Sequence, residues 1–518
     1  MKKRLWWLLA LFILALAAVC LIKILSDGGA PKGPTIQFWG AARKVGGSCL
    51  LVENAGTRFI VDCGALEERG SGALPPLPDS LSFVILTHAH IDHCGLLPEL
   101  FKAGFRGAVY CTRGTAELVP IMLGMMRGIS REKGEKAAFG KALASLTPVP
   151  FGRTVTERSV AFTFRRAEHL LGAASVEIRL AAGRDTVMLV VSGDIGAGSS
   201  LLLPPLEKFG RADYVVMEST YGGTVRDSTG EGMPGGHTAF AEAIGTALSG
   251  GGDVLVPAFT LGRTQEVMAV VDRFMRTGVI PPETEVYVDS PTAQKITDIY
   301  RRMTDELSVW TREFYRGEAL RFPALREVRS RTSLKVHARR HRPAIFISSS
   351  GDLEHASSPR HLMRMFADGK NLLCVIGWQS PGSLGARLLA GETPVLVRHQ
   401  EGRKLREDWI SPAIAVRAFH SFSGHADATG LLAWLGAIHG VKQVFLVHGE
   451  EKAALALAQS IGKRLGIPVE IPRRGDVFTL LSGKHPVTQA LPHSGPVGAG
   501  APARAAFTAP DSAYEGEE

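Results

Sequence analysis

The sequence predicts a mixed α/β protein with two domains of different pattern, and three observations support this prediction. From about residue 35, short apolar runs are separated by glycine-containing turns, a pattern typical of a meandering sheet. From about residue 238, helical and strand patterns alternate, as in a separate α/β domain. The chain has 518 residues, of which 45% are hydrophobic and 21% charged. This composition excludes a largely disordered chain and a small disulfide-stapled scaffold.

The chain begins with a segment typical of a membrane anchor. Three basic residues precede an uninterrupted apolar run from Leu5 to Ile22, which would span about 27 Å as a helix. The run is longer than the apolar region of most signal peptides, so we predict an uncleaved transmembrane helix in residues 1–27, with cleavage near Ala15-Leu16-Ala17 as the alternative. The basic start predicts a single-pass protein with a cytoplasmic N-terminus and the folded body of the chain on the extracytoplasmic side. Lys23 and Lys32, on the other flank, oppose that orientation.

A linker rich in glycine and proline, residues 28–34, precedes the first domain. Four β-type runs separated by turns predict the opening strands of that domain. They are Thr35–Trp39, Cys49–Glu53, Phe59–Asp62 and Phe83–Leu86.

The second block alternates between helical and strand patterns, which predicts an α/β domain of its own. We expect helices at Phe240–Leu248 and Arg263–Arg276, strands at Asp253–Pro257, Glu285–Val288, Ala344–Ser348 and Leu372–Ile376, and long charged helices up to about Lys335. The last segment, residues 483–518, is rich in Pro, Ala, Gly and Ser without an apolar period, and is predicted to be a disordered tail.

The net charge indicates a class of partner, and the cysteine spacing indicates whether disulfides hold the fold. The formal net charge is +9, which favours a polyanionic partner such as nucleic acid or anionic lipid. The six cysteines form no C-x-x-C pair, so we predict no disulfide framework and expect most of the thiols to be buried.

The strongest chemical signal follows the apolar run Phe83–Leu86. His88, His90, Asp92 and His93 lie within six residues, and imidazole nitrogen and carboxylate oxygen are ligands that zinc and manganese accept. His88 and His90 project to one side of an extended or turning segment, whereas Asp92 and His93 follow round the turn. The spacing therefore predicts a site for two metal ions.

These residues match the H-x-H-x-D-H signature, and the sequence resembles the metallo-β-lactamase superfamily. Asp62 resembles the aspartate of the first motif, which orients the ligand loop, His169 the histidine of the third, and Asp194 the carboxylate that bridges both metals. Within that superfamily, the sequence resembles the β-CASP nucleases, which include ribonuclease J and the polyadenylation cleavage nuclease. Three motifs carry this narrower resemblance: Met217-Glu218-Ser219-Thr220-Tyr221-Gly222, Ser423-Gly424-His425-Ala426-Asp427 and Leu446-Val447-His448-Gly449-Glu450.

The resemblance implies a fold and an organisation. We expect an αββα sandwich, formed by residues 35–222 and 409–482, with a β-CASP cap domain inserted at residues 223–408. It also implies that His88, His90 and His169 hold one ion, that Asp92, His93 and His448 hold the other, and that Asp194 bridges them.

The resemblance further implies the chemistry. Two Zn²⁺ ions, or Mn²⁺, would activate a water for attack on phosphorus. The candidate catalytic residues are Asp92, Glu218 and His425, with His425 as the general acid and Glu218 orienting its ring. The alternative for the last two is a purely structural hydrogen bond.

Four further residues are candidates for binding substrate. Ser349 and Ser350 follow a predicted strand and can offer hydroxyl and backbone donors to phosphate, Gln379 lies in a glycine-containing loop, and Arg263 lies in a segment that also resembles the family. Asp352 and Glu354 depart from the family's usual turn and would repel phosphate if they pointed inward.

The leading hypothesis is a membrane-anchored dinuclear-metal hydrolase that cleaves single-stranded RNA. Two alternatives stay open: a metal-dependent hydrolase of DNA or of a small extracytoplasmic ester, and a non-catalytic nucleic-acid-binding protein. Single-stranded RNA and the membrane are the expected partners, and a homodimer is left open.

Overall fold

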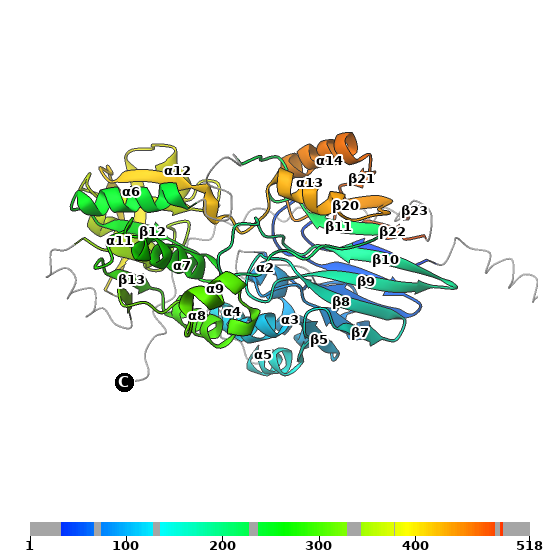
Figure 1. The fold of residues 1–518 in the computed structure, drawn as a ribbon. Coiled ribbons are helices and arrows are strands. Elements are labelled where there is room, and N and C mark those ends of the chain that lie inside the picture. Colours follow the sequence, from blue (N-terminus) through cyan, green and yellow to red (C-terminus); the bar gives the residue numbers. More distant parts are fainter. Residues whose placement is uncertain are drawn as a thin grey trace, which may run out of the picture.

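A computed structural model of the chain describes residues 33–66, 74–127, 135–226, 237–328, 343–377, 379–402, 404–481 and 487–489. It has two parts that lie side by side, one built on two sheets and the other on a single large sheet (Figure 1). The first domain contains both chain ends of the described structure, and the cap is inserted between its halves. The mixed α/β class predicted from the sequence is confirmed.

The first sheet of the first domain has eight strands in the order β23-β22-β1-β2-β3-β4-β5-β6. Ala55 and Gly56 both have positive φ and join β2 to β3 through a two-residue turn, which matches the right-handed twist of the paired strands. The strands are β1 Thr35–Phe38, β2 Leu50–Asn54, β3 Thr57–Val61, β4 Phe83–Ile85, β5 Ala108–Cys111, β6 Leu146–Pro148, β22 Val477–Thr479 and β23 Val487–Gln489. The segment predicted as a disordered tail from residue 483 therefore contains one short strand, because β23 pairs with β22.

The second sheet has seven strands in the order β21-β20-β11-β10-β9-β8-β7. An apolar core lies between the two sheets and includes Phe38, Phe59, Phe83, Phe162 and Phe445. Phe59 and Phe83 stack with ring centroids 4.7 Å apart. The strands are β7 Thr154–Glu157, β8 Val160–Arg166, β9 Ala174–Ala182, β10 Asp185–Val191, β11 Tyr214–Glu218, β20 Gln443–Val447 and β21 Val469–Glu470.

Helices cover the outer faces of this pair of sheets. Trp434 and Leu457 belong to the cluster that joins α13 and α14 to β11 and β20. Leu100, Leu118 and Val119 belong to the cluster on the other side, which includes the first sheet. The helices are α2 Ile91–Cys94, α3 Leu97–Lys102, α4 Arg113–Arg127, α5 Glu135–Ala144, α13 Ala428–Gly436 and α14 Glu451–Leu465, with the short 3₁₀ turn η1 at Pro78–Ser80.

The cap is built on a parallel sheet of six strands in the order β14-β13-β15-β12-β16-β19. Alternate side chains of β12 point to opposite faces, so Val254 and Val256 join one core cluster and Leu255 joins another. Helices α6, α7 and α8 contribute to the first cluster, and α11 and α12 to the second. This alternation of helix and strand agrees with the pattern read from the sequence.

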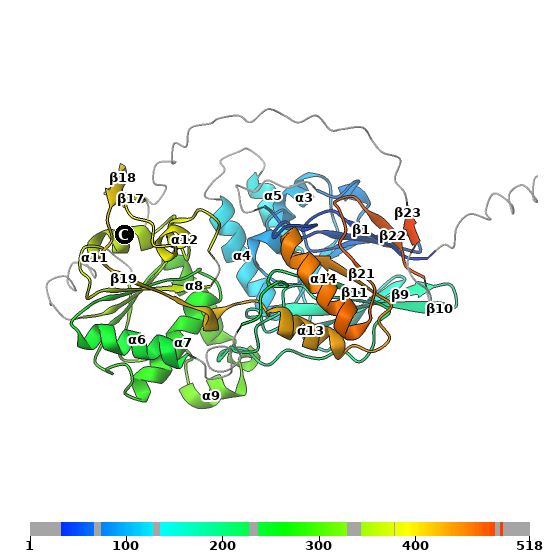
Figure 2. The same ribbon diagram turned by 90° about the horizontal axis from the view of Figure 1, so that it is seen from above.

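The elements of the cap follow one another along the chain (Figure 2). They are α6 Thr238–Ser249, β12 Val254–Pro257, α7 Arg263–Arg276, β13 Val286–Asp289, α8 Pro291–Arg302, η2 Thr304–Glu306, α9 Val309–Tyr315, β14 Leu325–Glu327, β15 Ile345–Ser348, α11 Ser358–Met365, β16 Leu372–Ile376, α12 Leu384–Leu389, β17 Val395–Glu401, β18 Lys404–Ile410, β19 Ala415–Phe419 and η3 His420–Phe422. The prediction of charged helices up to Lys335 is wrong for residues 316–328, because Pro323 cannot continue a helix and Leu325–Glu327 forms a strand. The rest of that prediction lies outside the described residues.

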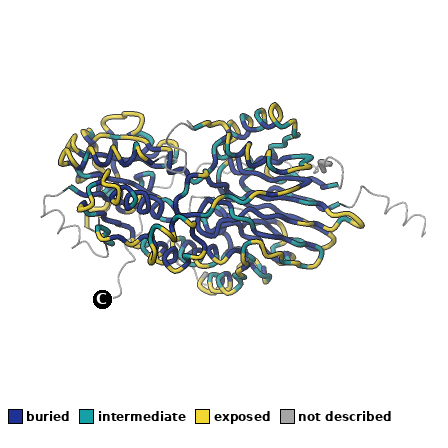
Figure 3. The backbone as a smooth tube through the Cα atoms, viewed as in Figure 1, coloured by how far each residue is buried: buried dark blue, intermediate teal, exposed yellow. Residues whose placement is uncertain are grey.

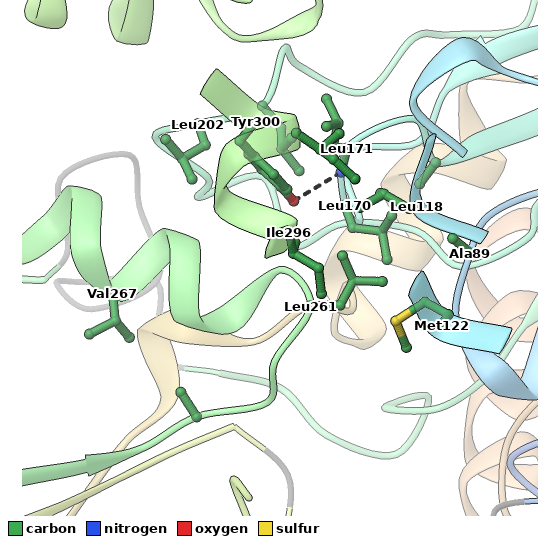
Figure 4. Close-up of a cluster of buried hydrophobic side chains, with 14 of the residues drawn as sticks. Ala89, Leu118, Met122, Leu170, Leu171, Leu202, Leu261, Val267, Ile296 and Tyr300 are labelled. Atoms are coloured by element: carbon green, nitrogen blue, oxygen red, sulfur yellow. Dashed lines mark hydrogen bonds between the residues drawn. The ribbon is translucent and has the colours of Figure 1, made fainter. Parts of the chain in front are cut away.

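The cap and the first domain share a buried core at their junction. Tyr300 and Ile296 of α8 lie beside Leu170 and Leu171 of the first domain, and the Tyr300 hydroxyl accepts a hydrogen bond from the Leu171 backbone N–H at 3.2 Å (Figure 4). Buried backbone runs through both parts and across the junction (Figure 3). Because protein cores are close-packed, this contact fixes the cap relative to the strand ends of the first domain.

Within the described part of the chain, no helix is both long and apolar enough to cross a bilayer. The predicted anchor in residues 1–27 lies outside the described residues.

Candidate metal centre

Seven side chains predicted as metal ligands meet at one end of the paired sheets. His88 follows β4, His169 follows β8, Asp194 follows β10 and His448 follows β20. Strands β8, β10, β11 and β20 run in the same direction, so their carboxyl ends lie at one edge. The remaining three, His90, Asp92 and His93, come from the start of the single-turn helix α2, for which His90 is the N-cap residue.

The first group consists of His88, His90, His169 and Asp194. His90 Nδ1 lies 3.2 Å from His88 Nε2 and 3.0 Å from His169 Nε2. Asp194 Oδ2 lies 3.4 Å from His88 Nε2 and 3.5 Å from His169 Nε2. Three ring nitrogens and one carboxylate oxygen thus converge on one point, which suits a tetrahedral ion such as zinc.

The second group consists of Asp92, His93 and His448. Asp92 Oδ2 lies 3.0 Å from His448 Nε2 and 3.8 Å from His93 Nε2. Asp194 reaches this group with its other oxygen, since Asp194 Oδ1 lies 3.4 Å from His93 Nε2 and 3.6 Å from His448 Nδ1. Each oxygen of Asp194 therefore faces a different group, as a bridging ligand requires.

Two observations show that the Asp194 carboxylate and the histidines of the first group fit a metal ion. Asp194 Oδ1 is buried and accepts no hydrogen bond from the described residues, and a buried carboxylate oxygen without a partner is costly unless a cation neutralises it. Burial also lowers the pKa of His88 and His169 well below the usual value, and that of His90 to about 4. The three imidazoles are consequently neutral near pH 7, the form that binds metal.

Hydrogen bonds behind the ligands fix the direction of their rings. Asp62 Oδ2 lies 2.7 Å from His93 Nδ1, and the Asp62 carboxylate also accepts hydrogen bonds from the Thr87 backbone N–H and hydroxyl. His169 Nδ1 donates to the Gly424 carbonyl at 2.6 Å. In His93 and His169, the hydrogen bond at Nδ1 leaves Nε2 directed toward the candidate metal centre. A hydrogen bond at the second ring nitrogen commonly sets the tautomer of a metal-binding histidine in this way. Asp62 occupies the orienting position implied by the sequence.

Glu218 and His425 form a pair beside the metal groups. His425 Nδ1 lies 3.0 and 3.1 Å from the two Glu218 oxygens and 4.0 Å from Asp194 Oδ2. Glu218 is fully buried at the end of β11, and Oε1 also accepts a hydrogen bond from the Ile195 backbone N–H at 2.5 Å. Burial acts to lower the pKa of His425, but the Glu218 carboxylate raises it above its usual value. The Glu218 carboxylate thus favours the protonated imidazole, the form that can donate a proton.

Comparison with known proteins agrees with this geometry. Three family models match in order along the chain: the metallo-β-lactamase superfamily at residues 42–225, the β-CASP domain at 264–388, and a Zn-dependent metallo-hydrolase RNA specificity domain at 413–472. Ribonuclease TTHA0252 of Thermus thermophilus is 33% identical over 449 residues, which cover 85% of this chain and 98% of that protein. The chain belongs to the β-CASP family of the metallo-β-lactamase superfamily. The resemblance read from the sequence is thus confirmed.

Other known proteins align over similar lengths. The transcription termination factor FttA of Methanocaldococcus jannaschii is 28% identical, over 86% of this chain and 71% of its own length. An RNase J-like protein of the same organism is 27% identical, over 86% of this chain and 99% of its own. A crystal structure of a protein of unknown function from Enterococcus faecalis superimposes with a TM-score of 0.50 at 12% identity, covering 86% of this chain and 100% of that one. That last similarity concerns the fold alone.

The predicted substrate-binding residues lie in the β-CASP cap, and each of them donates a hydrogen bond within the protein. Ser349 donates to the Ser290 hydroxyl at 2.8 Å, and Ser350 donates to Asp352 Oδ1 at 2.6 Å. Gln379 donates to the Gly351 carbonyl at 3.1 Å. Their role in substrate binding stays a prediction.

Arg263, the fourth predicted substrate-binding residue, contacts the segment that leads to His425. It begins α7, and its guanidinium donates to the Phe422 carbonyl. A Cβ atom on Gly424 would lie 3.4 Å from Arg263 Nη2 and 3.2 Å from His169 Cε1. Arg263 therefore reaches the loop that carries His425, at the point where this loop packs against His169.

Several residues that support the candidate site were not predicted from the sequence. Arg226 Nη1 donates to the His425 carbonyl at 2.9 Å, and its guanidinium carbon lies 4.3 Å from the centre of the Tyr221 ring. The Arg226 backbone N–H donates to Asp427, which also caps α13. The Thr220 hydroxyl lies 3.1 Å from His448 Nδ1. All four residues lie within or beside the quoted motifs, but spacing alone does not show that these motifs touch.

Proposed function

We propose that this β-CASP protein is a metal-dependent ribonuclease that hydrolyses phosphodiester bonds in single-stranded RNA. The observation that carries the proposal is the joint presence of two ligand groups, each facing one oxygen of Asp194, and of the Glu218–His425 pair beside them. The names of the Thermus thermophilus ribonuclease and the RNase J-like protein, and the RNA specificity domain matched at residues 413–472, support RNA as the substrate.

The two ligand groups fit a pair of Zn²⁺ ions, and His and Asp ligands also accept Mn²⁺. Ions held by His88, His90 and His169 and by Asp92, His93 and His448 would supply an acidic water as nucleophile and positive charge for the attacked phosphate. Asp194 would neutralise part of that charge from between the groups.

His425, oriented by Glu218, can then protonate the leaving oxygen. Glu218 accepts the Nδ1 proton of His425, so Nε2 carries the other proton of the imidazolium. That proton can pass to the 3′ oxygen as the P–O bond breaks, which is general acid catalysis. The bond from Ile195 to Glu218 holds the carboxylate in place and stabilises its charge.

Asp352 and Glu354, the two acidic residues that follow Ser350, do not argue against a phosphate substrate. Asp352 accepts the Ser350 hydroxyl, and Glu354 Oε1 accepts the Leu384 backbone N–H at 2.5 Å. Both carboxylates are bonded within the cap, and a carboxylate that accepts such bonds is partly neutralised.

Membrane attachment belongs to the same proposal. The apolar run from Leu5 to Ile22 supports a single-pass anchor, and the basic residues before it support an extracytoplasmic catalytic domain. A topology reporter fused after residue 482 tests the orientation. An extracytoplasmic signal is expected, and a cytoplasmic one would overturn the orientation while favouring RNA processing at the inner surface.

Cleavage of end-labelled single-stranded RNA and DNA by the zinc-loaded full chain tests the activity. We expect metal-dependent RNA cleavage that falls about 10²–10⁴-fold in His425→Ala with the bound metal retained. His439→Ala is the matched control, because that histidine is exposed and its backbone alone makes hydrogen bonds to the neighbouring loop.

Other outcomes distinguish the rival functions. If metal is bound and neither nucleic acid is cut, the ribonuclease proposal is wrong, and small extracytoplasmic esters become the substrates to test. Cleavage of DNA alone would assign the same centre to a deoxyribonuclease.

A further inference from the structure

The hairpin of β17 and β18 forms a separate two-stranded sheet on the cap. Its register runs from Val395 opposite Ile410 to Glu401 opposite Lys404, and it stands out from the body of the cap in Figure 2. No other described strand pairs with β18. The outer edge of β18 is therefore open within the described structure.

The register identifies which backbone groups lie on that open edge. Glu401 and Lys404 flank a two-residue turn and form a hydrogen-bonded pair, after which such pairs occur at every second position. The N–H and C=O groups of Leu405, Glu407 and Trp409 consequently point away from β17. A row of unpaired groups of this kind is a template for pairing with another strand.

The same residues expose large apolar side chains. The exposed fraction is 50% for Leu405 and 66% for Trp409, and because side chains alternate along a strand these two lie on the same face of β18. The base of the hairpin is firmly held, since Val395, Val397 and Ile410 are buried in the second core cluster of the cap. An ordered strand thus presents both an open edge and an apolar surface.

We propose that β18 pairs antiparallel with β18 of a second copy of this chain, about a twofold axis at Glu407. This register overlaps the whole of Lys404–Ile410 and places Leu405 opposite Trp409 of the partner subunit. All three outward-facing residues then fall in hydrogen-bonded pairs, which gives about six main-chain bonds across the interface. No other register satisfies these groups over the full length of the strand.

The charges of β18 favour a second copy over other strands. Arg406 lies opposite Asp408 of the partner subunit, and opposite charges in directly facing positions stabilise a sheet. The like charges on the axis are compensated, since Arg398 Nε lies 2.8 Å from Glu407 Oε1 within each hairpin. Charges of one sign along β18 would disfavour pairing with any strand, whereas the charges of β18 are complementary to those of an antiparallel second copy. The inference is independent of the proposed nuclease activity.

Proline substitution tests which edge is used. In Glu407→Pro the lost N–H points to the open edge, so pairing with β17 survives while the interface loses its central bonds. Gln400→Pro is the matched control, because its N–H points to the opposite edge of the hairpin. We expect light scattering of the full chain in detergent to show dimers for the native chain and for Gln400→Pro, and a loss of dimer for Glu407→Pro.

A cysteine on the axis provides a second test that needs no disruptive change. Two Glu407→Cys residues would lie about 5.5 Å apart at Cα, within the range of a disulfide. Two Gln400→Cys residues would lie about 19 Å apart, because they are separated by three strand spacings, about 14 Å, and are offset along the strands by four residues, about 13 Å. The background is Cys20→Ser, since the other five cysteines are buried.

Under mild oxidation, Glu407→Cys should cross-link to a dimer and Gln400→Cys should not. A monomeric native chain, a dimer that persists in Glu407→Pro, or equal cross-linking of the two cysteine variants would overturn the proposal. In each case β18 would be an edge whose charges prevent pairing.

Discussion

Individual residues at the metal centre differ in how far the sequence could predict their surroundings. His88, His90, Asp92 and His93 were evident because they lie within six residues of one another. His448 lies 356 positions from its partner Asp92, so only the family resemblance placed it in the same group.

Arg226 shows what spacing could not reveal. No role for Arg226 was predicted from the sequence, whereas the structure places it against the carbonyl of His425. A contact between positions 199 apart along the chain depends on how β11 and the start of α13 are brought together, and no local pattern encodes that.

Arg226 is a positioning residue for the proposed general acid. Its guanidinium bonds the His425 carbonyl and lies over Tyr221, so Arg226→Met should let the His425 loop move relative to Glu218. A hydrogen bond from a charged group contributes about 1.5–3 kcal/mol. We expect kcat on single-stranded RNA to fall at least about tenfold with KM little changed.

Steady-state kinetics of Arg226→Met beside Arg226→Lys and Arg153→Met check this role. The lysine variant keeps a charged donor and should recover part of kcat, whereas Arg153 is exposed before β7 and its loss should have no effect. An Arg226→Met enzyme with native kcat would show that the contact only stabilises the fold.

At the scale of elements, the sequence predicted strands and helices where one apolar period persisted. The strand predicted at Asp253–Pro257 is β12, and the helix predicted at Arg263–Arg276 coincides with α7. The pattern failed where polar residues dominate: β14 is partly exposed, and β18 has only one buried residue, at its end. Such strands are specified by their pairing with β13 and β17, and an apolar period does not reveal them.

The junction between elements explains how the cap can affect the metal centre. Tyr300 of α8 bonds the backbone of Leu171, two residues after the candidate ligand His169. Arg263, at the start of α7, reaches the Phe422 carbonyl in the segment that leads to His425. Two cap helices thus contact the two loops that carry a candidate metal ligand and the proposed general acid.

For the whole molecule, composition and order of motifs predicted the mixed α/β class and the family, and both are confirmed. The sequence could not place the two parts relative to each other, because the shared core draws single residues from α4, α7, α8 and the loop after His169. Long-range packing of that kind is a property of the folded chain and leaves no periodic trace in the sequence.

Removal of the metal should destabilise the whole molecule as well as abolish activity. The ligand groups join segments from both halves of the first domain, since Asp92 and His448 lie on either side of the inserted cap. An ion at 100 times its dissociation constant stabilises the folded state by about 2.7 kcal/mol. At about 2–4 °C per kcal/mol for a large domain, a chelator should lower Tm by roughly 5–10 °C, and added zinc should restore it.

Differential scanning calorimetry of the native chain, Asp194→Asn and His439→Ala measures this shift in Tm. His439→Ala should behave as native, whereas Asp194→Asn should lose most of the response, because its amide cannot neutralise two cations. An unchanged Tm after complete metal removal would show that the two groups do not hold structural ions.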